Sequence, residues 1–434
     1  MEYTVEDLSP VKKKVNITVP VDEVEAALSA TLAMYRTTVT LDGFRKGKVP
    51  ASIVEKRFHK EIYSEATQDL VNVHINEVMQ AMDVSPISRI DFDGGELERG
   101  VVFNYAISFE VMPTFTLPDY DGIEVELEKA IVDEKEVDEV VDRIRRNMAE
   151  LVTVAEARPG KDGDVVVLDF AAYDGDQPLE GISADNFQLS LGDKQALEGF
   201  EELVKTIPAG QEGEGPLTFP ADFINPEFAG KTVTIKVKVH AVKERRLPEQ
   251  DDDLAQKAGG FESMEKMREA VVSSYMQSRN QLNKAAAQKS MLDKLLKLVE
   301  FDLPESMVEM YRMNLLQDMN QKLERQGRSM ESLGKTLDEL RADVTPEAQE
   351  ISRTQIFLLA AARKEGLEVT EQEVDGQLQQ QAVRSGQDYK ALKDYYVKNG
   401  LIFNLRDRLL ADKAMDAIFA KANVKEIEPS ADKA

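Results

Sequence analysis

The chain has 434 residues, of which 42% are hydrophobic and 31% are charged, and its formal net charge is −26. This length suggests about three domains of roughly 150 residues each. The absence of cysteine excludes disulfides, thiolate nucleophiles and cysteine-ligated metal sites, and the excess of acids argues against broad affinity for DNA or RNA. The acidic start, MEYTVEDLSP, lacks the basic and apolar regions of a secretory signal, and no apolar run is long enough to span a membrane. A cytoplasmic protein without membrane contact is therefore expected.

Histidine is rare in this chain and gives no sign of a metal site. His59, His74 and His240 are far apart, and none has a second ligand at the spacing that metal motifs use. No cofactor is expected from the sequence.

Residues 1–115 combine strand and helix patterns, so we expect an α+β domain. Residues 1–20 alternate as one strand does, and Asp22 opens a helix that should end near Val39. Further along, the pattern predicts helices to about Phe58 and from Ile62 to Ala81, and β-rich segments at Val84–Phe92 and Val101–Val111.

The stretch LDGFRKGKVP, residues 41–50, interrupts this domain with a projecting loop. Gly43 and Gly47 permit positive φ and tight turns, and Phe44 between them stands beside cations, as on a docking surface. The alternative is an ordinary surface turn whose Phe44 packs on its own domain. The segment from residue 43 to residue 60 contains one acid, Glu55, and six cations: Arg45, Lys46, Lys48, Lys56, Arg57 and Lys60. Local contact with RNA is thus compatible with the acidic chain.

The rest of the chain divides by composition into three parts. Residues 116–157 form an acidic connector, with one strand in which Ile123, Val125 and Leu127 alternate with acids, and one helix that Asp133 caps. In residues 158–245, β-rich segments separated by turn residues predict an antiparallel sheet with one short helix. Residues 246–434 are helical, with a capping box from Thr370 to Glu373, and a disordered tail is expected from about residue 425.

This order of parts, with the motifs GFRKGKVP, FDLPESMVEMYRMNLL and ARKEGLEVTEQEV, resembles the bacterial trigger factor family over essentially the full chain. The resemblance implies an ATP-independent chaperone that docks beside the exit tunnel of the large ribosomal subunit and holds nascent and unfolded chains. The loop would contact a ribosomal protein and ribosomal RNA through Gly43, Phe44, Arg45, Lys46, Gly47 and Pro50. Self-association away from the ribosome is suggested by the family and opposed by the charge of −26.

The β-rich part resembles the prolyl isomerases of FKBP type, whose apolar pocket holds a twisted X–Pro bond. Carried over by position, the pocket residues are Phe170, Phe187, Leu197, Phe200, Phe223 and Ile235. The chain departs from the family in having aliphatic Leu179 and Ile235 where aromatic residues are usual, which favours binding over fast catalysis. The alternative is that these residues are only the core of a small sheet. Phe170 is expected to matter more for folding than Phe200.

Met307, Met310 and Met313 recur at helical spacing in the C-terminal part. Flexible thioethers suit a groove that accepts varied clients, although such a stripe is more often core. Two rival functions remain: a cytoplasmic prolyl isomerase that does not depend on ribosomes, and a scaffold for the assembly of completed proteins, which would need no docking loop.

Overall fold

The computed structural model describes residues 1–45, 47–175, 177–193, 196–220, 228–325 and 328–429. The chain divides into two compact units. The first contains Met1–Asp121, Leu292–Leu316 and Arg341–Lys421, and the second contains Gly122–Met291, Gln317–Leu340 and Ala422–Ala434. The expected multidomain class, with antiparallel sheets and a helical C-terminal region, is confirmed.

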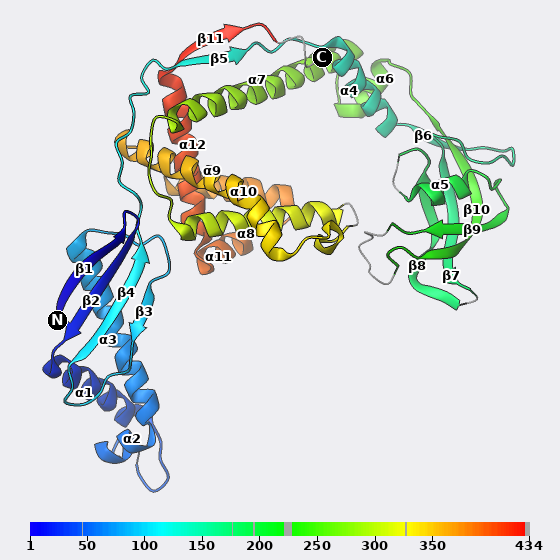
Figure 1. Ribbon diagram of the computed structural model, residues 1–434. Helices are drawn as coiled ribbons and strands as arrows, with labels where there is room; N and C mark the ends of the chain where they lie inside the picture. Colours follow the sequence, from blue (N-terminus) through cyan, green and yellow to red (C-terminus); the bar gives the residue numbers. More distant parts are fainter. Residues whose placement is uncertain (46, 176, 194–195, 221–227, 326–327, 430–434) are drawn as a thin grey trace. The chain divides into compact units, whose positions relative to one another are not determined.

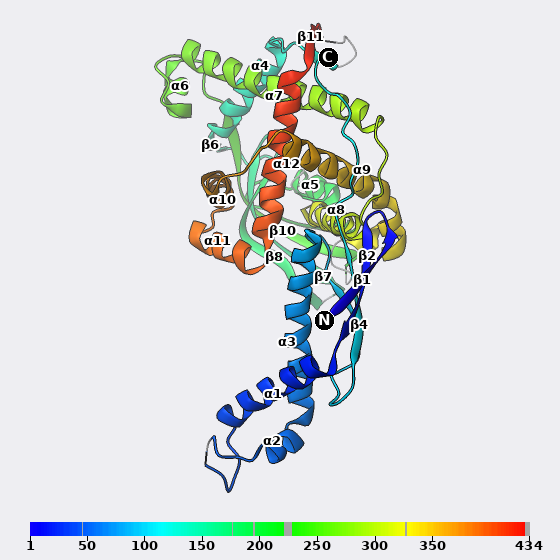
Figure 2. The same cartoon turned by 90° about the vertical axis from the view of Figure 1, so that its left-hand side faces the viewer.

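The first unit begins with a four-stranded antiparallel sheet that helices cover on one face (Figure 1, Figure 2). Alternation along the second strand buries Val15, Ile17 and Val19, and Leu28 and Ile62 from the helices pack on the same core. The sheet order is β1-β2-β4-β3, and the elements of this domain are β1 (Glu2–Ser9), β2 (Lys12–Val19), α1 (Val21–Thr38), α2 (Ala51–Arg57), α3 (His59–Met82), β3 (Asp91–Gly94) and β4 (Phe103–Glu110).

The first twenty residues form a hairpin, where one strand was expected. Pro10 cannot donate a ladder hydrogen bond, and the Ser9 Oγ accepts a hydrogen bond from Val11 N at 3.2 Å. The chain therefore turns back at this point, and β1 becomes an edge strand beside β2.

The remainder of the first unit is helical. The capping box at the start of α10 is confirmed: the Thr370 Oγ accepts from Glu373 N at 3.3 Å, and the Glu373 carboxylate accepts from Thr370 N at 2.8 Å. The Lys413 ammonium, 2.6 Å away, and the two Thr370 donors lower the pKa of Glu373 to about 2. The helices that lie wholly or partly here are α7 (Met264–Leu296), α8 (Glu305–Arg325), α9 (Leu337–Lys364), α10 (Glu371–Ser385), α11 (Tyr389–Lys398) and α12 (Leu401–Lys421).

Two contacts join the α+β domain to these helices within the first unit. The buried Glu110 carboxylate, at the end of β4, accepts hydrogen bonds from Glu305 N at 3.2 Å and Ser306 N at 2.9 Å, and so satisfies free amides at the start of α8. Close by in sequence, the ring of Phe115 stacks on Phe301 with a centroid distance of 4.2 Å.

The chain leaves this unit past Tyr120, whose side chain is 1% exposed. Its hydroxyl donates to Glu365 Oε1 at 2.6 Å, and Lys364 and Lys421 lie over its ring. Burial and the Glu365 carboxylate raise the pKa of Tyr120, so the hydroxyl stays protonated and remains a donor at physiological pH.

The second unit contains a five-stranded antiparallel sheet around β10, which pairs with β6, β7 and β9. Alternation buries Val233, Ile235, Val237 and Val239 of β10 against Phe200 on the short helix α5. Most of α7 and parts of α8 and α9 lie in this unit, and its other elements are β5 (Glu124–Glu128), α4 (Glu134–Asn147), β6 (Glu150–Thr153), β7 (Val165–Asp174), β8 (Gln177–Ser190), α5 (Glu198–Val204), β9 (Glu212–Thr218), β10 (Thr232–Arg246), α6 (Asp252–Gly259), the 3₁₀ helix η1 (Met330–Leu333) and β11 (Asn423–Ile427).

The expected disordered tail is wrong for residues 425–427. They belong to β11, which pairs in parallel with β5 so that Val424 lies opposite Val125, and Val125 is buried. The pairing joins segments about 300 residues apart, and β11, which reads NVKEI, lacks the alternation that predicted its partner strand. This pairing therefore has no local signal in the sequence.

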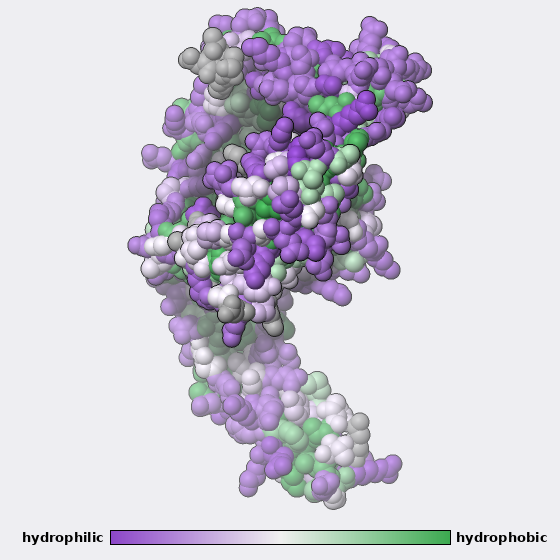
Figure 3. Space-filling view, turned by 90° about the vertical axis from the view of Figure 1, so that its right-hand side faces the viewer, coloured by the Kyte–Doolittle hydropathy of each residue, from purple (hydrophilic) through white to green (hydrophobic). Residues whose placement is uncertain are grey.

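The surface agrees with the charged composition. On the face that Figure 3 shows, hydrophilic residues dominate and apolar residues form separate patches. In the part of the chain that the structure describes, we find no helix long and apolar enough to cross a bilayer.

We predict that Glu110→Ala lowers the free energy of unfolding by about 1–2 kcal/mol, because the amides of Glu305 and Ser306 lose their buried acceptor. Glu110→Gln keeps one acceptor oxygen and should lose less. Urea unfolding followed by the helical circular-dichroism signal measures both. Equal stability of Glu110→Ala and the unmodified chain would show that the cap contributes nothing.

Candidate functional site

The loop between α1 and α2 turns tightly at both of its glycines. Gly43 has φ +86° and Gly47 has φ +79°, and a Cβ added at either would meet no atom within 4 Å. The glycines are therefore required by the backbone conformation and not by close packing. Phe44 N donates to Leu41 O at 3.0 Å, and Lys48 N donates to Arg45 O at 2.9 Å, which closes two successive turns.

The root of the loop is anchored, whereas its tip is exposed. Val49 is fully buried, and its carbonyl accepts from the Arg36 Nε at 3.3 Å. Phe44 is 39% exposed, and Arg45 and Pro50 are exposed as well. The loop lies at the end of the α+β domain beside α2 (Figure 2). Lys46, which is also a predicted docking residue, lies outside the described residues.

An aromatic cluster on the five-stranded sheet contains most of the predicted isomerase residues. The ring of Phe170 on β7 lies 5.6 Å from that of Phe187 on β8 and 5.1 Å from that of Phe200 on α5. Leu197 and Ile235 belong to the same hydrophobic cluster. The structure thus brings five of the predicted residues together, and Phe223 lies outside the described residues.

A β-bulge in β8 sets the direction of the Phe187 side chain. Leu168 pairs with Phe187 but Phe170 pairs with Ala184, so β8 has one extra residue over this stretch. Asn186 has φ +53° there, and its amide donates to Asp169 Oδ1 at 2.7 Å. That hydrogen bond, with the nearby His240 ring at 2.7 Å, lowers the pKa of Asp169.

Burial divides the cluster into a structural part and an accessible part. Phe200 is 6% exposed and Ile235 is 1% exposed, whereas Phe187 is 37% exposed and Phe170 is half-buried. The expectation that Phe170 is more structural than Phe200 is therefore wrong. Phe200 lies on the helix that closes the core, and Phe170 lies toward its open edge.

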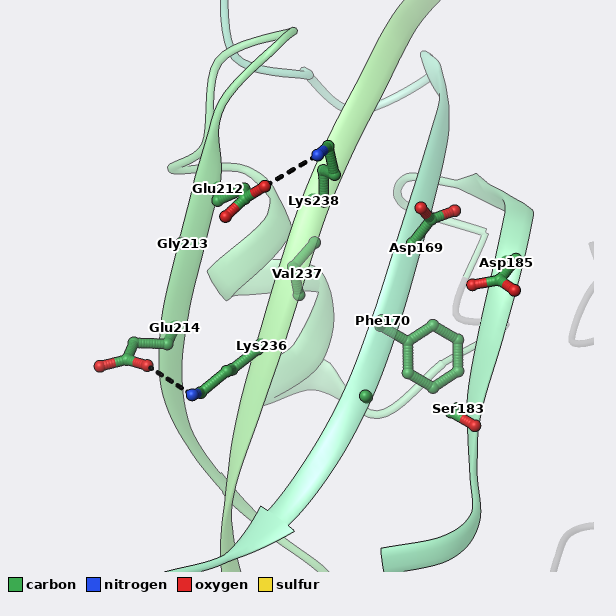
Figure 4. A pocket seen from close by; sticks show the side chains of 11 residues that line it. Asp169, Phe170, Ser183, Asp185, Glu212, Gly213, Glu214, Lys236, Val237 and Lys238 are labelled. Atoms are coloured by element: carbon green, nitrogen blue, oxygen red, sulfur yellow. Dashed lines mark ion pairs between the residues drawn. The ribbon is translucent and has the colours of Figure 1, made fainter. Parts of the chain in front are cut away.

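The sheet also carries a hollow of about 500 Å³, which Figure 4 shows. Of the predicted isomerase residues that the structure describes, Phe170 alone lines it. Most of its lining is charged, and Lys238 pairs with Glu212 at 2.9 Å while Lys236 pairs with Glu214 at 3.9 Å. A prolyl ring needs an apolar wall, so the aromatic cluster and not this hollow is the candidate pocket.

A larger groove, of about 1200 Å³, lies within the first unit. Met307 and Met310 line it, whereas Met313 does not and is 57% exposed. Sequence reasoning missed its other apolar lining, which comes from several elements and has no shared period along the chain: Ile87, Met112, Tyr311, Ile351, Leu359, Leu367, Tyr396, Leu401, Phe403, Leu405 and Leu410.

The histidines serve the fold or the surface. His74 is buried beside the Tyr105 hydroxyl at 3.2 Å, and burial lowers its pKa. His59 is exposed and stacks on Tyr63. Across the described ranges, no group of three or more acids and histidines could hold a metal ion.

Two family descriptions match the chain: "Bacterial trigger factor protein (TF)" over residues 1–144 and "Bacterial trigger factor protein (TF) C-terminus" over residues 263–420. The trigger factor of Nitratidesulfovibrio vulgaris strain DP4 is 77% identical over 430 residues, which cover 99% of each chain. That of the Miyazaki F strain is 77% identical over 431 residues, which cover 99% of this chain and 100% of its own. The trigger factor of Oleidesulfovibrio alaskensis is 66% identical over 427 residues, or 98% of each chain. The chain therefore belongs to the bacterial trigger factor family.

Proposed function

We propose that this chain is a cytoplasmic, ATP-independent chaperone that docks at the large ribosomal subunit near the exit tunnel and holds nascent and unfolded polypeptides. The observation that carries the proposal is the loop of residues 41–50, which presents Phe44 and Arg45 from an anchored root. Membership of the trigger factor family supports it.

Docking would use two kinds of contact. An exposed phenyl ring can enter an apolar pocket on a ribosomal protein, and Phe44 has this exposure. The Arg45 and Lys46 cations would bind phosphates of ribosomal RNA, and such contacts fix position without reading sequence. The large negative charge elsewhere limits this contact to the loop and its surroundings.

Client holding would use the groove of the first unit. Its lining of methionine and aromatic side chains, with Met307, Met310 and Phe403 among them, can adapt to many apolar segments. Weak binding to a wide surface suits a holder that must release its client without consuming nucleotide. Self-association away from the ribosome would cover the same apolar surface, and the net charge opposes it.

The sheet of the second unit would add prolyl isomerisation of FKBP type. This reaction needs no nucleophile, because rotation about the X–Pro bond costs amide resonance and an apolar site that excludes water can favour the twisted form. Phe170 and Phe187 supply accessible aromatic walls. Since Leu179 and Ile235 are aliphatic, we expect binding of proline-containing segments with modest catalysis.

The combined change Phe44→Ala, Arg45→Ala and Lys46→Ala should abolish co-sedimentation with ribosomes, because it removes the exposed ring and the charges of the loop. The fold should persist, since exposed loop residues contribute little to a core. The matched control removes the same residue types elsewhere in the domain: Phe92→Ala, Arg89→Ala and Lys14→Ala. Pelleting of the loop variant with ribosomes at moderate salt would contradict the assignment of docking to this loop, whereas failure of the unmodified chain to pellet would favour a ribosome-independent isomerase.

Phe187→Ala should reduce isomerase activity about tenfold and leave stability almost unchanged, because the side chain is 37% exposed. Phe200→Ala should cost about 3–5 kcal/mol of stability, since it empties a buried position, so its activity would be confounded by unfolding. A protease-coupled assay on an X–Pro peptide measures the rate, with Tyr173→Ala on β7 as the control. Full activity of folded Phe187→Ala would reject the assignment of the pocket.

Removal of residues 151–245 should preserve most suppression of client aggregation. Glu150 and Arg246 are antiparallel partners in β6 and β10, so the chain enters and leaves the excised sheet side by side and a short Gly-Ser link can rejoin it. Light scattering of a refolding client measures the outcome. A folded deletion variant that prevents no aggregation would place the principal client site in the sheet domain.

In that shortened chain, Met307→Gln with Met310→Gln should weaken suppression because both side chains line the groove, and Met313→Gln should not. This pair of variants separates the groove from a general effect of lost methionine.

A further inference from the structure

A set of cations lies beside the docking loop but outside it. Lys56 and Arg57 end α2, and Lys60 is in the first turn of α3. All three are exposed, and in the part of the chain that the structure describes they form no ion pair. By contrast, Arg99 of the same domain pairs with both Glu25 and Glu55.

Two acids adjoin these cations in sequence, Glu55 and Glu61: among the described residues Glu61 forms no ion pair with them, and Glu55 is already bound. Glu55 Oε1 accepts from the Arg99 Nε at 2.7 Å and from the Tyr63 hydroxyl at 2.9 Å. The Arg99 guanidinium holds the pKa of Glu55 below its ordinary value, so it stays ionised and committed to these donors. Lys56 and Arg57 therefore keep their positive charge uncompensated by Glu55.

Helix electrostatics explains only part of this arrangement. Lys56 and Arg57 are favourable at the C-terminal end of α2, where the macrodipole is negative. Lys60 lies at the N-terminal end of α3, where the macrodipole is positive and disfavours a cation. The helix dipole thus does not account for Lys60, whereas an anionic ligand would.

His59 adds a flat aromatic surface among the cations. Its ring is exposed and stacks on Tyr63, with a centroid distance of 4.0 Å and an interplanar angle of 9°. Tyr63 is 7% exposed and its hydroxyl is anchored on Glu55, so its ring holds the imidazole in a fixed plane. Unpaired bases stack on such rings while adjacent cations bind their phosphates.

We propose that Lys56, Arg57, Lys60 and the ring of His59 form an RNA-binding face that engages an unpaired segment of ribosomal RNA, with the cations on phosphates and the imidazole on a base. The proposal rests on ribosome docking by the loop and identifies a second, separate contact. Because most of the chain is acidic, this face and the loop together form a local positive surface that aligns the α+β domain on RNA.

The test measures the affinity of the full chain for large ribosomal subunits over a series of salt concentrations. Lys56→Gln with Arg57→Gln and Lys60→Gln should weaken binding about tenfold and make the salt dependence shallower by about 2 units of slope, since each lost phosphate contact contributes about 0.7. The control, Arg384→Gln with Lys390→Gln and Lys398→Gln, makes the same charge change at exposed positions of the helical part and should alter neither quantity.

His59→Ala should weaken binding and leave the salt slope unchanged, and His59→Phe should restore the affinity because it keeps a stacking ring. Circular dichroism checks that all variants are folded. Equal losses for His59→Ala and His59→Phe would reject the stacking contact.

Wild-type affinity of the cation variant, or weaker binding with an unchanged salt slope, overturns the proposal; the second result would indicate a protein partner. Failure of the docking proposal gives a different result. In that case the variant that lacks Phe44, Arg45 and Lys46 would still bind ribosomes.

Discussion

The contact between the end of β4 and the start of α8 is the constraint on which the first unit depends. A buried carboxylate, that of Glu110, satisfies two backbone amides of a helix that begins almost 200 residues later in the chain. The stacked rings of Phe115 and Phe301 add apolar contact to this polar one. Because an unmet buried acceptor or amide is costly, these contacts stabilise the packing of the α+β domain on the helices. The docking loop and the groove therefore belong to one compact unit.

The distribution of charge is compatible both with an exposed apolar groove and with the proposed local contact with RNA. A net charge of −26 keeps a chain with an apolar groove soluble and discourages contact with nucleic acid in general. The reversed sign lies near the loop, at an end of the α+β domain where Glu55 is ionised and paired with Arg99. Since the Debye length is about 8 Å at physiological salt, this end responds to its own charges more than to the distant acids.

The five-stranded sheet is organised as an insertion. Its entry at Glu150 and its exit at Arg246 are hydrogen-bonded neighbours, and its hydrophobic cluster is separate from that of the α+β domain. Within the sheet, the bulge at Asn186 and the burial of Phe200 place the aromatic rings at graded depths. The two aliphatic residues of the predicted pocket lie deeper than Phe187, since Ile235 is buried and Leu179 is partly buried.

Local chemistry let the sequence determine several features by itself. Gly43 and Gly47 mark positive φ because only glycine adopts it freely, and Thr370 with Glu373 forms its capping box within four residues. The multidomain class followed from the length of the chain, and the family followed from motifs. The docking residues and the isomerase residues were carried over by position, and the structure describes all of them except Lys46 and Phe223.

Only the tertiary structure decided what depends on distant partners. The pairing of β5 with β11, the exclusion of Met313 from the groove that Met307 and Met310 line, and the deeper burial of Phe200 all result from contacts between elements far apart in sequence. A helical or strand period fixes which residues share a face, but it does not specify what covers that face. The packing of the whole unit decides which element covers each face, and this determines which side chains are buried and which are accessible.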